Sequence, residues 1–367
     1  MSNPSDDPVF DDIREPPQPE AGVRWGRRAV VLGGLLASVA GGALLTARHS
    51  GALPLPRTAD GLRILRVSLP VNAPCVAPLI LAEQIGLYRD RGLKVEFTNW
   101  TDTPSLLEAV ATGKVDLGAG MIMQFMRPLE QGFDLKMVAG THGGCMRMVG
   151  SRRAGVSDNI ASLRGKTIGI ADATGFAYNT FALLLKSNGV DPLRDVAWRV
   201  YPSPLLEAAL MKGEIQAYAD SDPLMYLAQR RSGGDLVEIL SNLSSPWQGR
   251  VCCVVVASNM LLQRDRSAVL SLVDAMVQAS EICAADPMQV ARAFAQYAAV
   301  KAPVEDIAAV LRMQTHHMHP LGLDLAAEVA FYAAQLKTIG VMSADLDPEA
   351  FARSIVDDVT RGEAAHV

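Results

Sequence analysis

The sequence lacks the short motifs that mark the commonest catalytic centres. It contains no GxSxG, no HExxH and no P-loop, so a nucleophile elbow, a helical zinc-protease site and a nucleotide-phosphate cradle are not indicated. It also lacks a dense run of Lys and Arg. The net charge of −5 and an isoelectric point near 5.7 argue against a nucleic-acid partner. We therefore expect no enzyme, no cofactor and no nucleic acid.

Cysteine is scarce as well, and no CxxC spacing occurs. A disulfide framework is not expected in a chain of 367 residues, and the odd count leaves at least one thiol unpaired. Apolar residues make up 49% of the chain and charged residues 20%, which are values of a globular protein with a core. The five cysteines are Cys75, Cys145, Cys252, Cys253 and Cys283.

The N-terminal region indicates export. Arg27 and Arg28 precede residues 29–47, which carry no charge and are only mildly apolar. A paired Arg before such a segment resembles a twin-arginine signal; the alternative is a single membrane anchor. We predict a disordered leader with the twin-arginine region over 1–28 and an apolar signal or anchor segment and linker over 29–60. The twin-arginine export machinery would then be a partner, and the location periplasmic.

The rest of the chain alternates strand and helix patterns, which predicts mostly parallel sheets. Residues 78–92 read as one helix. The pattern of residues 62–150 restarts in residues 151–252, where "LLEAALMKGEIQAYAD" repeats the layout of "LLEAVATGKVDLGAG". We therefore predict lobe 1 over 62–150 and lobe 2 over 151–252. Residues 253–362 complete the chain and are mostly helical in pattern; the family resemblance given below implies that they form the return crossover and the C-terminal helices that pack on lobe 1.

Several segments in this order carry a resemblance. "APLILAEQIGLYRDRGLKVEF", "LLEAVATGKVDLGAG" and "SLRGKTIGI" resemble the periplasmic solute-binding proteins of bacterial ABC importers, in the nitrate, sulfonate, taurine and thiamine-precursor group. The similarity covers roughly residues 62–355. It implies a two-lobed α/β fold of periplasmic-binding-protein type II, with a mostly parallel sheet flanked by helices in each lobe. It also implies a ligand cleft between the lobes that closes on the ligand.

The same resemblance implies a receptor that delivers a small solute to ABC permease subunits in the inner membrane. We expect a small organic or inorganic anion of the sulfonate, taurine or nitrate kind. A thiamine-pyrimidine precursor and a soft metal or metal complex stay as alternatives. The wider superfamily includes eukaryotic thiamine-pyrimidine synthases with a multi-cysteine run, of which "RVCC" is a faint echo.

Candidate ligand contacts follow from the rule that ligands sit outside the carboxyl ends of parallel strands. An ordinary turn, a core position or a helix cap is the plain alternative for each. In lobe 1 the candidates are Asn72, Ala73, Cys75, Gly120, Met121, His142, Gly144 and Cys145. In lobe 2 they are Thr174, Gly175, Tyr178, Ser203 and Asp220.

The alternatives for the solute depend on a few side chains. Arg147 is the cation expected nearest the cleft and would suit an oxyanion, although a salt bridge at the hinge explains it equally well. The carboxylate of Asp220 would suit an amine or a pyrimidine.

A soft-metal site would need Cys75, His142, Cys145, Met121 and one of Cys252 and Cys253 to converge. The plain alternative for the paired cysteines is a buried strand. His316, His317 and His319 resemble metal ligands by composition, but we expect a solvated loop there.

Overall fold

The computed structural model describes residues 54–70, 72–100, 103–173, 175–243, 247–298, 302–314 and 325–359. The predicted leader and residues 29–53 of the apolar segment and linker lie outside this part of the chain. Thr174, His316, His317 and His319 lie outside it as well.

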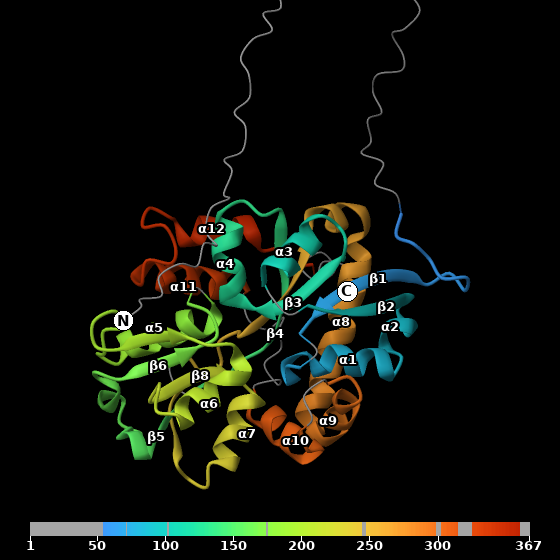
Figure 1. Cartoon of the computed structure of the whole chain (residues 1–367). Coiled ribbons are helices and arrows are strands. Elements are labelled where there is room, and N and C mark those ends of the chain that lie inside the picture. Colours follow the sequence, from blue (N-terminus) through green and yellow to red (C-terminus); the bar gives the residue numbers. More distant parts are fainter. Residues whose placement is uncertain are drawn as a thin grey trace, which may run out of the picture. The chain divides into compact units, whose positions relative to one another are not determined.

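The described residues build two sheets of five strands each, with helices on their faces (Figure 1). The first sheet has the order β2-β1-β3-β10-β4, and the second has the order β7-β6-β8-β5-β9. The strands of the first sheet are β1 (Arg63–Leu69), β2 (Leu93–Asn99), β3 (Leu117–Met121), β4 (Leu135–His142) and β10 (Cys253–Ser258). Those of the second are β5 (Met146–Ser151), β6 (Thr167–Ile170), β7 (Ala197–Val200), β8 (Ala217–Ser221) and β9 (Leu236–Ser241).

One strand in each sheet runs against its neighbours. In the first sheet, β10 pairs antiparallel with β3 and β4. In the second sheet, β5 pairs antiparallel with β8 and β9. The chain therefore leaves the first sheet at His142, enters the second at Met146, and returns to the first at Cys253. The predicted two-lobed α/β fold is confirmed, and the two crossovers join its lobes.

Twelve α-helices lie in the described residues. They are α1 (Ala77–Gln84), α2 (Leu87–Asp90), α3 (Thr103–Ala111), α4 (Ile122–Glu130), α5 (Phe176–Ser187), α6 (Leu206–Met211), α7 (Leu224–Arg231), α8 (Asn259–Ala285), α9 (Pro287–Ala295), α10 (Val304–Met313), α11 (Leu325–Thr338) and α12 (Pro348–Ile355). The prediction of a single helix over 78–92 is wrong. Gly86 has a φ of 83° and separates α1 from α2, because a residue in the left-handed region ends a helix.

The long helix α8 packs against the first lobe. By length and composition α8 could cross a membrane, but half of its most apolar window is buried. It packs against α1, α9 and β4 of the first lobe. Asp265 interrupts α8 with non-helical backbone angles, and its carboxylate accepts a hydrogen bond of 3.0 Å from the amide of Ala268. This is the capping role expected where a helical segment restarts.

The C-terminal helices contact both lobes. α10 packs against α9, while α12 packs against β4. Arg230 of α7 pairs with Asp306 of α10, and the ammonium of Lys186 in α5 donates to the carbonyl of Thr338 in α11. Two helices of the second sheet are therefore tied to the C-terminal helices by charged side chains.

Candidate functional site

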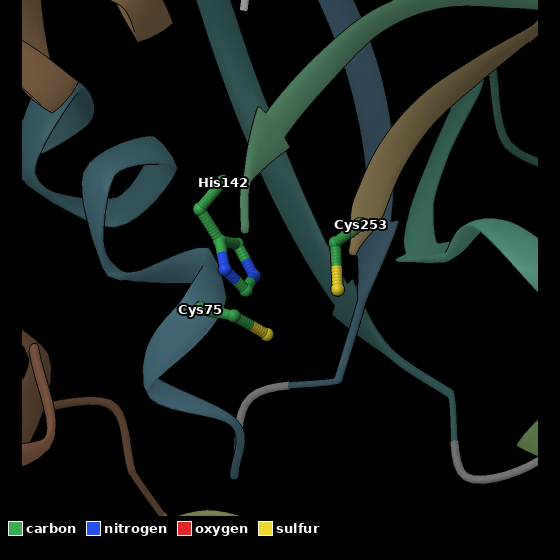
Figure 2. Close-up of side chains that lie close together, drawn as sticks. All are labelled: Cys75, His142 and Cys253. Carbon is green, nitrogen blue, oxygen red and sulfur yellow. The ribbon is translucent and has the colours of Figure 1, made fainter. Parts of the chain in front are cut away.

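Three chain segments bring soft donor atoms to one edge of the first sheet. The short 3-10 helix η1 (Pro74–Val76) follows β1 and buries Cys75. Strand β4 ends at His142, and β10 begins at Cys253, which lies opposite His142 in the antiparallel pairing. Figure 2 shows the thiols of Cys75 and Cys253 and the imidazole of His142 converging on one space.

The distances define a compact group of donors. The donor atoms of Cys75, His142 and Cys253 all lie within 4.8 Å of one another. The sulfurs of Cys145, Cys252 and Cys253 form a second such triad, so Cys253 belongs to both. The Sγ atoms of Cys145 and Cys252 are 3.1 Å apart. We call these four thiols and the His142 imidazole the thiol–imidazole cluster.

The cluster is buried, and all of its cysteines are free thiols. Its residues are between 1% and 6% exposed. The backbone around it is fixed by hydrogen bonds. The amide of Cys252 donates to the carbonyl of His142 over 2.8 Å, and the hydroxyl of Thr141 donates to the carbonyl of Cys253 over 3.2 Å. The backbone at His142, Cys252 and Cys253 is thus held by hydrogen bonds at the paired ends of β4 and β10, while Cys75 lies on η1.

Asn242 supports the cluster from the second crossover. Its Oδ1 accepts hydrogen bonds of 2.9 Å from the amides of both Cys145 and Met146. Its Nδ2 donates to the sulfur of Cys252 over 3.4 Å. One buried amide thus joins the first crossover to the second. Outer hydrogen bonds of this kind orient the donors of a site.

The thiols differ in acidity. A hydrogen bond from Cys253 lowers the pKa of Cys75 to about 6, against the opposing effect of burial. Hydrogen bonds from Cys145 and Cys253 hold the pKa of Cys252 well below that of an ordinary thiol. Burial alone would lower the pKa of His142, but the hydrogen bond and charge of Cys75 outweigh it and raise that pKa. Two of the four thiols therefore favour the thiolate, which is the metal-binding and nucleophilic form.

The other lobe 1 candidates surround this group or shape its walls. Met121 is the N-cap of α4 and pairs with Cys253 across β3 and β10. A Cβ on Gly120 would lie 2.1 Å from Nε2 of Gln124 and 3.1 Å from the ring of Phe125, so that glycine serves close packing. Gly144 has a φ of 71°, and a Cβ there would lie 2.2 Å from Leu243. Ala73 caps η1 and is half-buried, while Asn72 is exposed.

The lobe 2 candidates do not form one group with the cluster. Gly175 is the N-cap of α5, which has no side-chain cap. Tyr178 packs edge-on against Trp198 with ring centroids 5.1 Å apart. Tyr178 also lines a hollow of about 550 Å³ with residues 189–193 and 338–340, away from the sulfur atoms.

Ser203 and Asp220 contact each other. The Ser203 hydroxyl donates to one oxygen of the Asp220 carboxylate, and the other oxygen accepts from the amide of Ser221 over 2.7 Å. Burial raises the pKa of Asp220, although the Ser203 hydrogen bond opposes this. A half-buried carboxylate of this kind is suited to a ligand that can donate hydrogen bonds.

Arg147 is occupied by acidic partners. Its Nε lies 3.0 and 2.9 Å from the two carboxylate oxygens of Asp222, and its Nη1 pairs with Glu238. Arg250 likewise pairs with Glu328 over 2.6 Å and lies over the ring of Phe331. The structure therefore shows the salt-bridge role for Arg147 that the sequence left open beside anion binding.

Sequence reasoning missed two parts of the site. It allowed only one of the paired cysteines into the cluster, because neighbouring residues of a strand point to opposite faces. Strand β10 begins at Cys253, so Cys252 lies before the strand and escapes this alternation. Asn242 was also missed; its position directly after a strand was the available signal.

Solved structures share this fold. A ligand-binding component of an ABC-type import system from Staphylococcus aureus with zinc bound is 16% identical with a TM-score of 0.67, covering 83% of this chain and 99% of its own. The nitrate-binding protein NrtA of Synechocystis PCC 6803 is 14% identical with a TM-score of 0.69, covering 83% and 89%. The alkanesulfonate-binding protein SsuA of Xanthomonas axonopodis pv. citri is 18% identical with a TM-score of 0.62, covering 81% and 98%. These likenesses show the two-lobed periplasmic-binding-protein fold.

Curated relatives match over shorter stretches. The 4-amino-5-hydroxymethyl-2-methylpyrimidine phosphate synthase THI11 of Saccharomyces cerevisiae is 27% identical over 28% of this chain and 30% of its own length. The nitrate import ATP-binding protein NrtC of Synechococcus elongatus is 25% identical over 58% of this chain and 34% of its own. The chain thus spans about a third of the length of these relatives. Residues 71–299 match the model of the NMT1-like family, and the chain belongs to that family.

Proposed function

We propose that this chain is the extracytoplasmic solute-binding receptor of an ABC importer, which captures a small solute by lobe closure and delivers it to the permease subunits. The observation that carries the proposal is the pair of adjacent crossovers joining two sheets of like topology. Such a frame allows two lobes to close like a hinge. The likeness to import-system components supports this reading. A receptor needs no catalytic group, and we propose that the protein is not an enzyme.

The charged contacts between the lobe 2 helices and the C-terminal helices support closure as the functional motion. Asp306 is buried, whereas the side chain of Arg230 is 57% exposed. A pair that is open to water on one side is weak enough to break when the lobes separate.

For the solute we propose a small anion of the nitrate or sulfonate kind. The N-terminus of α5 supports an anion, because its N-cap is Gly175, which has no side-chain oxygen to offer to the backbone N–H groups of the first turn. The nitrate-binding and alkanesulfonate-binding neighbours support the same class. Because Arg147 and Arg250 are paired with carboxylates, backbone groups would carry most of the recognition.

A second candidate solute is an aminopyrimidine related to the thiamine precursor. The half-buried carboxylate of Asp220 favours it, because a carboxylate accepts hydrogen bonds from an amino group and opposes an anion. The pyrimidine phosphate synthases among the relatives point to the same ligand class.

Calorimetry and thermal shift on the purified chain test these proposals. The panel holds nitrate, taurine, an alkanesulfonate and 4-amino-5-hydroxymethyl-2-methylpyrimidine, and a true ligand raises the melting temperature with its saturation. Asp220→Asn is expected to abolish pyrimidine binding and to leave anion binding intact. If no solute of the panel binds and small-angle scattering detects no closure with any of them, the receptor proposal is wrong.

We also propose export through the twin-arginine machinery. The paired Arg27 and Arg28 before an uncharged segment support it. Replacing both with Lys is expected to leave the protein in the cytoplasmic fraction. Export that persists in this variant would contradict the proposal and favour a general secretion route.

A further inference from the structure

We propose that the thiol–imidazole cluster is a binding site for a thiophilic d10 metal ion, Cu(I) or Zn(II). The proposal rests on the geometry of the cluster alone. It holds or fails independently of the solute that the lobes capture, because metal content is measured directly on the protein.

The spacing of the donors fits a single ion. Zinc lies about 2.3 Å from a thiolate sulfur and about 2.0 Å from an imidazole nitrogen. Two donors on one such ion are therefore at most roughly 4.6 Å apart, and roughly 3.7 Å apart in a tetrahedral site. In each triad every pair of donors lies within 4.8 Å. The most widely spaced pairs would approach by up to about 1 Å, and the Sγ atoms of Cys145 and Cys252, which are 3.1 Å apart, would separate by about 0.6 Å.

Cys253 is the key donor because it belongs to both triads. With Cys75 and His142 it forms a mixed sulfur and nitrogen site, and with Cys145 and Cys252 it forms an all-sulfur site. One ion can take three or four of these donors, or two ions can share the Cys253 thiolate. Loss of Cys253 removes a ligand from either arrangement.

The donor types select the class of ion. Thiolates and imidazole are the ligands that Cu(I) and Zn(II) prefer, whereas Mg²⁺ and Ca²⁺ need carboxylate, carbonyl or water oxygens. Both triads consist of buried side chains. Two thiolates neutralise a divalent ion, so the complex avoids the cost of an uncompensated buried charge.

The strand pairing and the Asn242 amide fix the donors before any ion arrives. Cys145 and Cys252 come from different crossovers, and Asn242 contacts both of them. Cys75 and His142 belong to the first lobe. An ion in the cluster would thus join the first lobe to both crossovers.

A disulfide is the main competing outcome. The sulfurs of Cys145 and Cys252 are 3.1 Å apart, and an S–S bond of about 2.05 Å would need only a small approach. That bond would release two protons and two electrons to an oxidant and would remove two donors. It would leave Cys75, His142 and Cys253 without the second triad.

Metal titration of the full chain, purified under reducing and anaerobic conditions, tests the site. Cu(I) is titrated against a chromophoric Cu(I) chelator, Zn(II) against a zinc chelator, and Co(II) reports thiolate ligation through its charge-transfer band. We expect one or two bound ions per chain, since the cluster holds two triads. The preferred ion is the one retained against the stronger chelator.

Cys253→Ala should weaken binding by at least ~100-fold, because it removes a direct ligand. Cys283→Ala is the matched control, since Cys283 is an equally buried free thiol of α8 outside the cluster. Cys75→Ala removes one triad and leaves the other. It is the replacement test variant if Cys253→Ala does not fold.

Three results would overturn the proposal. The first is a metal affinity of the wild-type protein that is no higher than that of Cys253→Ala, when circular dichroism shows that both proteins are folded. The second is an equal loss of metal in Cys283→Ala. The third is a native mass two hydrogens lower, without metal, in protein purified directly from cells, together with no metal uptake by the remaining triad of Cys75, His142 and Cys253. Solute binding that persists in Cys253→Ala separates failure of the metal site from failure of the receptor proposal.

Discussion

In the first sheet, the edge beside the crossovers presents four thiols and an imidazole, whereas the corresponding edge of the second sheet presents carboxylates and hydroxyls. Both sheets have the same arrangement of strands, with the antiparallel strand in the fourth place. The two edges meet where the amide of Asp222 donates to the carbonyl of Cys145 over 2.8 Å. The fold therefore sets the position of a site, and the side chains at the strand ends set its chemistry.

The difference also shows how each lobe satisfies its polar groups. In lobe 2, the guanidinium of Arg147 pairs with the carboxylates of both Asp222 and Glu238. In lobe 1, the thiols of Cys75 and Cys253 and the imidazole of His142 face one another, with their donor atoms within 4.8 Å. In lobe 2 a buried cation thus already has acidic partners within the chain, whereas the donors at the lobe 1 edge would suit the added cation that we propose.

Breaking the ion pair of lobe 2 should give the largest loss of stability. Arg147→Met leaves Asp222 as a buried, unpaired carboxylate, which should cost about 3–5 kcal/mol of unfolding free energy. Urea denaturation measures the loss. Arg153→Met is the control, because Arg153 is 79% exposed and its pair with Asp235 should contribute under about 1 kcal/mol. Equal losses in both variants would mean that the buried pair is not special.

Altering the backbone of the first crossover should have a smaller effect. Gly144→Ala combines a positive φ with a 2.2 Å approach to Leu243, and we expect about 2–3 kcal/mol of destabilisation. Gly132→Ala is matched to it, since Gly132 has a φ of 93° with nothing within 4 Å of a Cβ. That control should lose only about 1–2 kcal/mol. Thermal unfolding compares them, and an equal loss would show that the contact with Leu243 is easily relieved.

Cutting the tie between the lobes should shift closure more than stability. Arg230→Ala removes the pair with Asp306 and should lower solute affinity by a few fold, because an exposed pair contributes up to about 1 kcal/mol. Arg231→Ala is the control, since Arg231 is similarly exposed but pairs with Glu207 inside lobe 2. Calorimetry measures affinity and small-angle scattering measures closure. If Arg231→Ala changed affinity and closure as much as Arg230→Ala does, the pair between Arg230 and Asp306 would have no special part in closure.

The smallest expected effect is on the pH dependence of the unfolding free energy, through the raised pKa of Asp220. Burial raises its pKa above the ordinary value of 3.8, so the folded state holds the proton more tightly than the unfolded chain. This contribution to stability is full below the unfolded pKa and is lost as pH rises through the raised folded pKa. The difference in unfolding free energy between wild type and Asp220→Asn should fall over that range. A difference that stays constant with pH would mean that Asp220 titrates normally.

Much of the fold was predictable, and the reasons are local. The repeated "LLEA" layout placed equivalent helices and strands in both lobes, since apolar spacing and Gly ends are visible in the sequence. The break at Gly86 was not predictable, because the residues on both sides continue the helical pattern and only the φ of 83° ends it.

For the site, the strand-end rule brought Cys75, His142 and Cys145 into one set. The same rule placed Ser203 and Asp220 in that set as well. In the structure these two residues hydrogen-bond to each other and are not part of the thiol–imidazole cluster. The pairing of Arg147 with Asp222 depends on the register between β5 and its neighbours, which residue spacing does not reveal.

The position of β10 has a consequence for the order of folding. All five strands of the second sheet lie between residues 146 and 241, so that sheet can form as soon as this stretch leaves the ribosome. The first sheet must wait, because β10 fits between β3 and β4 and reaches Thr141 from 112 residues further along the chain. Closing so long a loop is slow, and until then β3 and β4 expose strand edges that invite aggregation. A chaperone that shields lobe 1 during synthesis would therefore raise the yield of folded protein more than one that shields lobe 2.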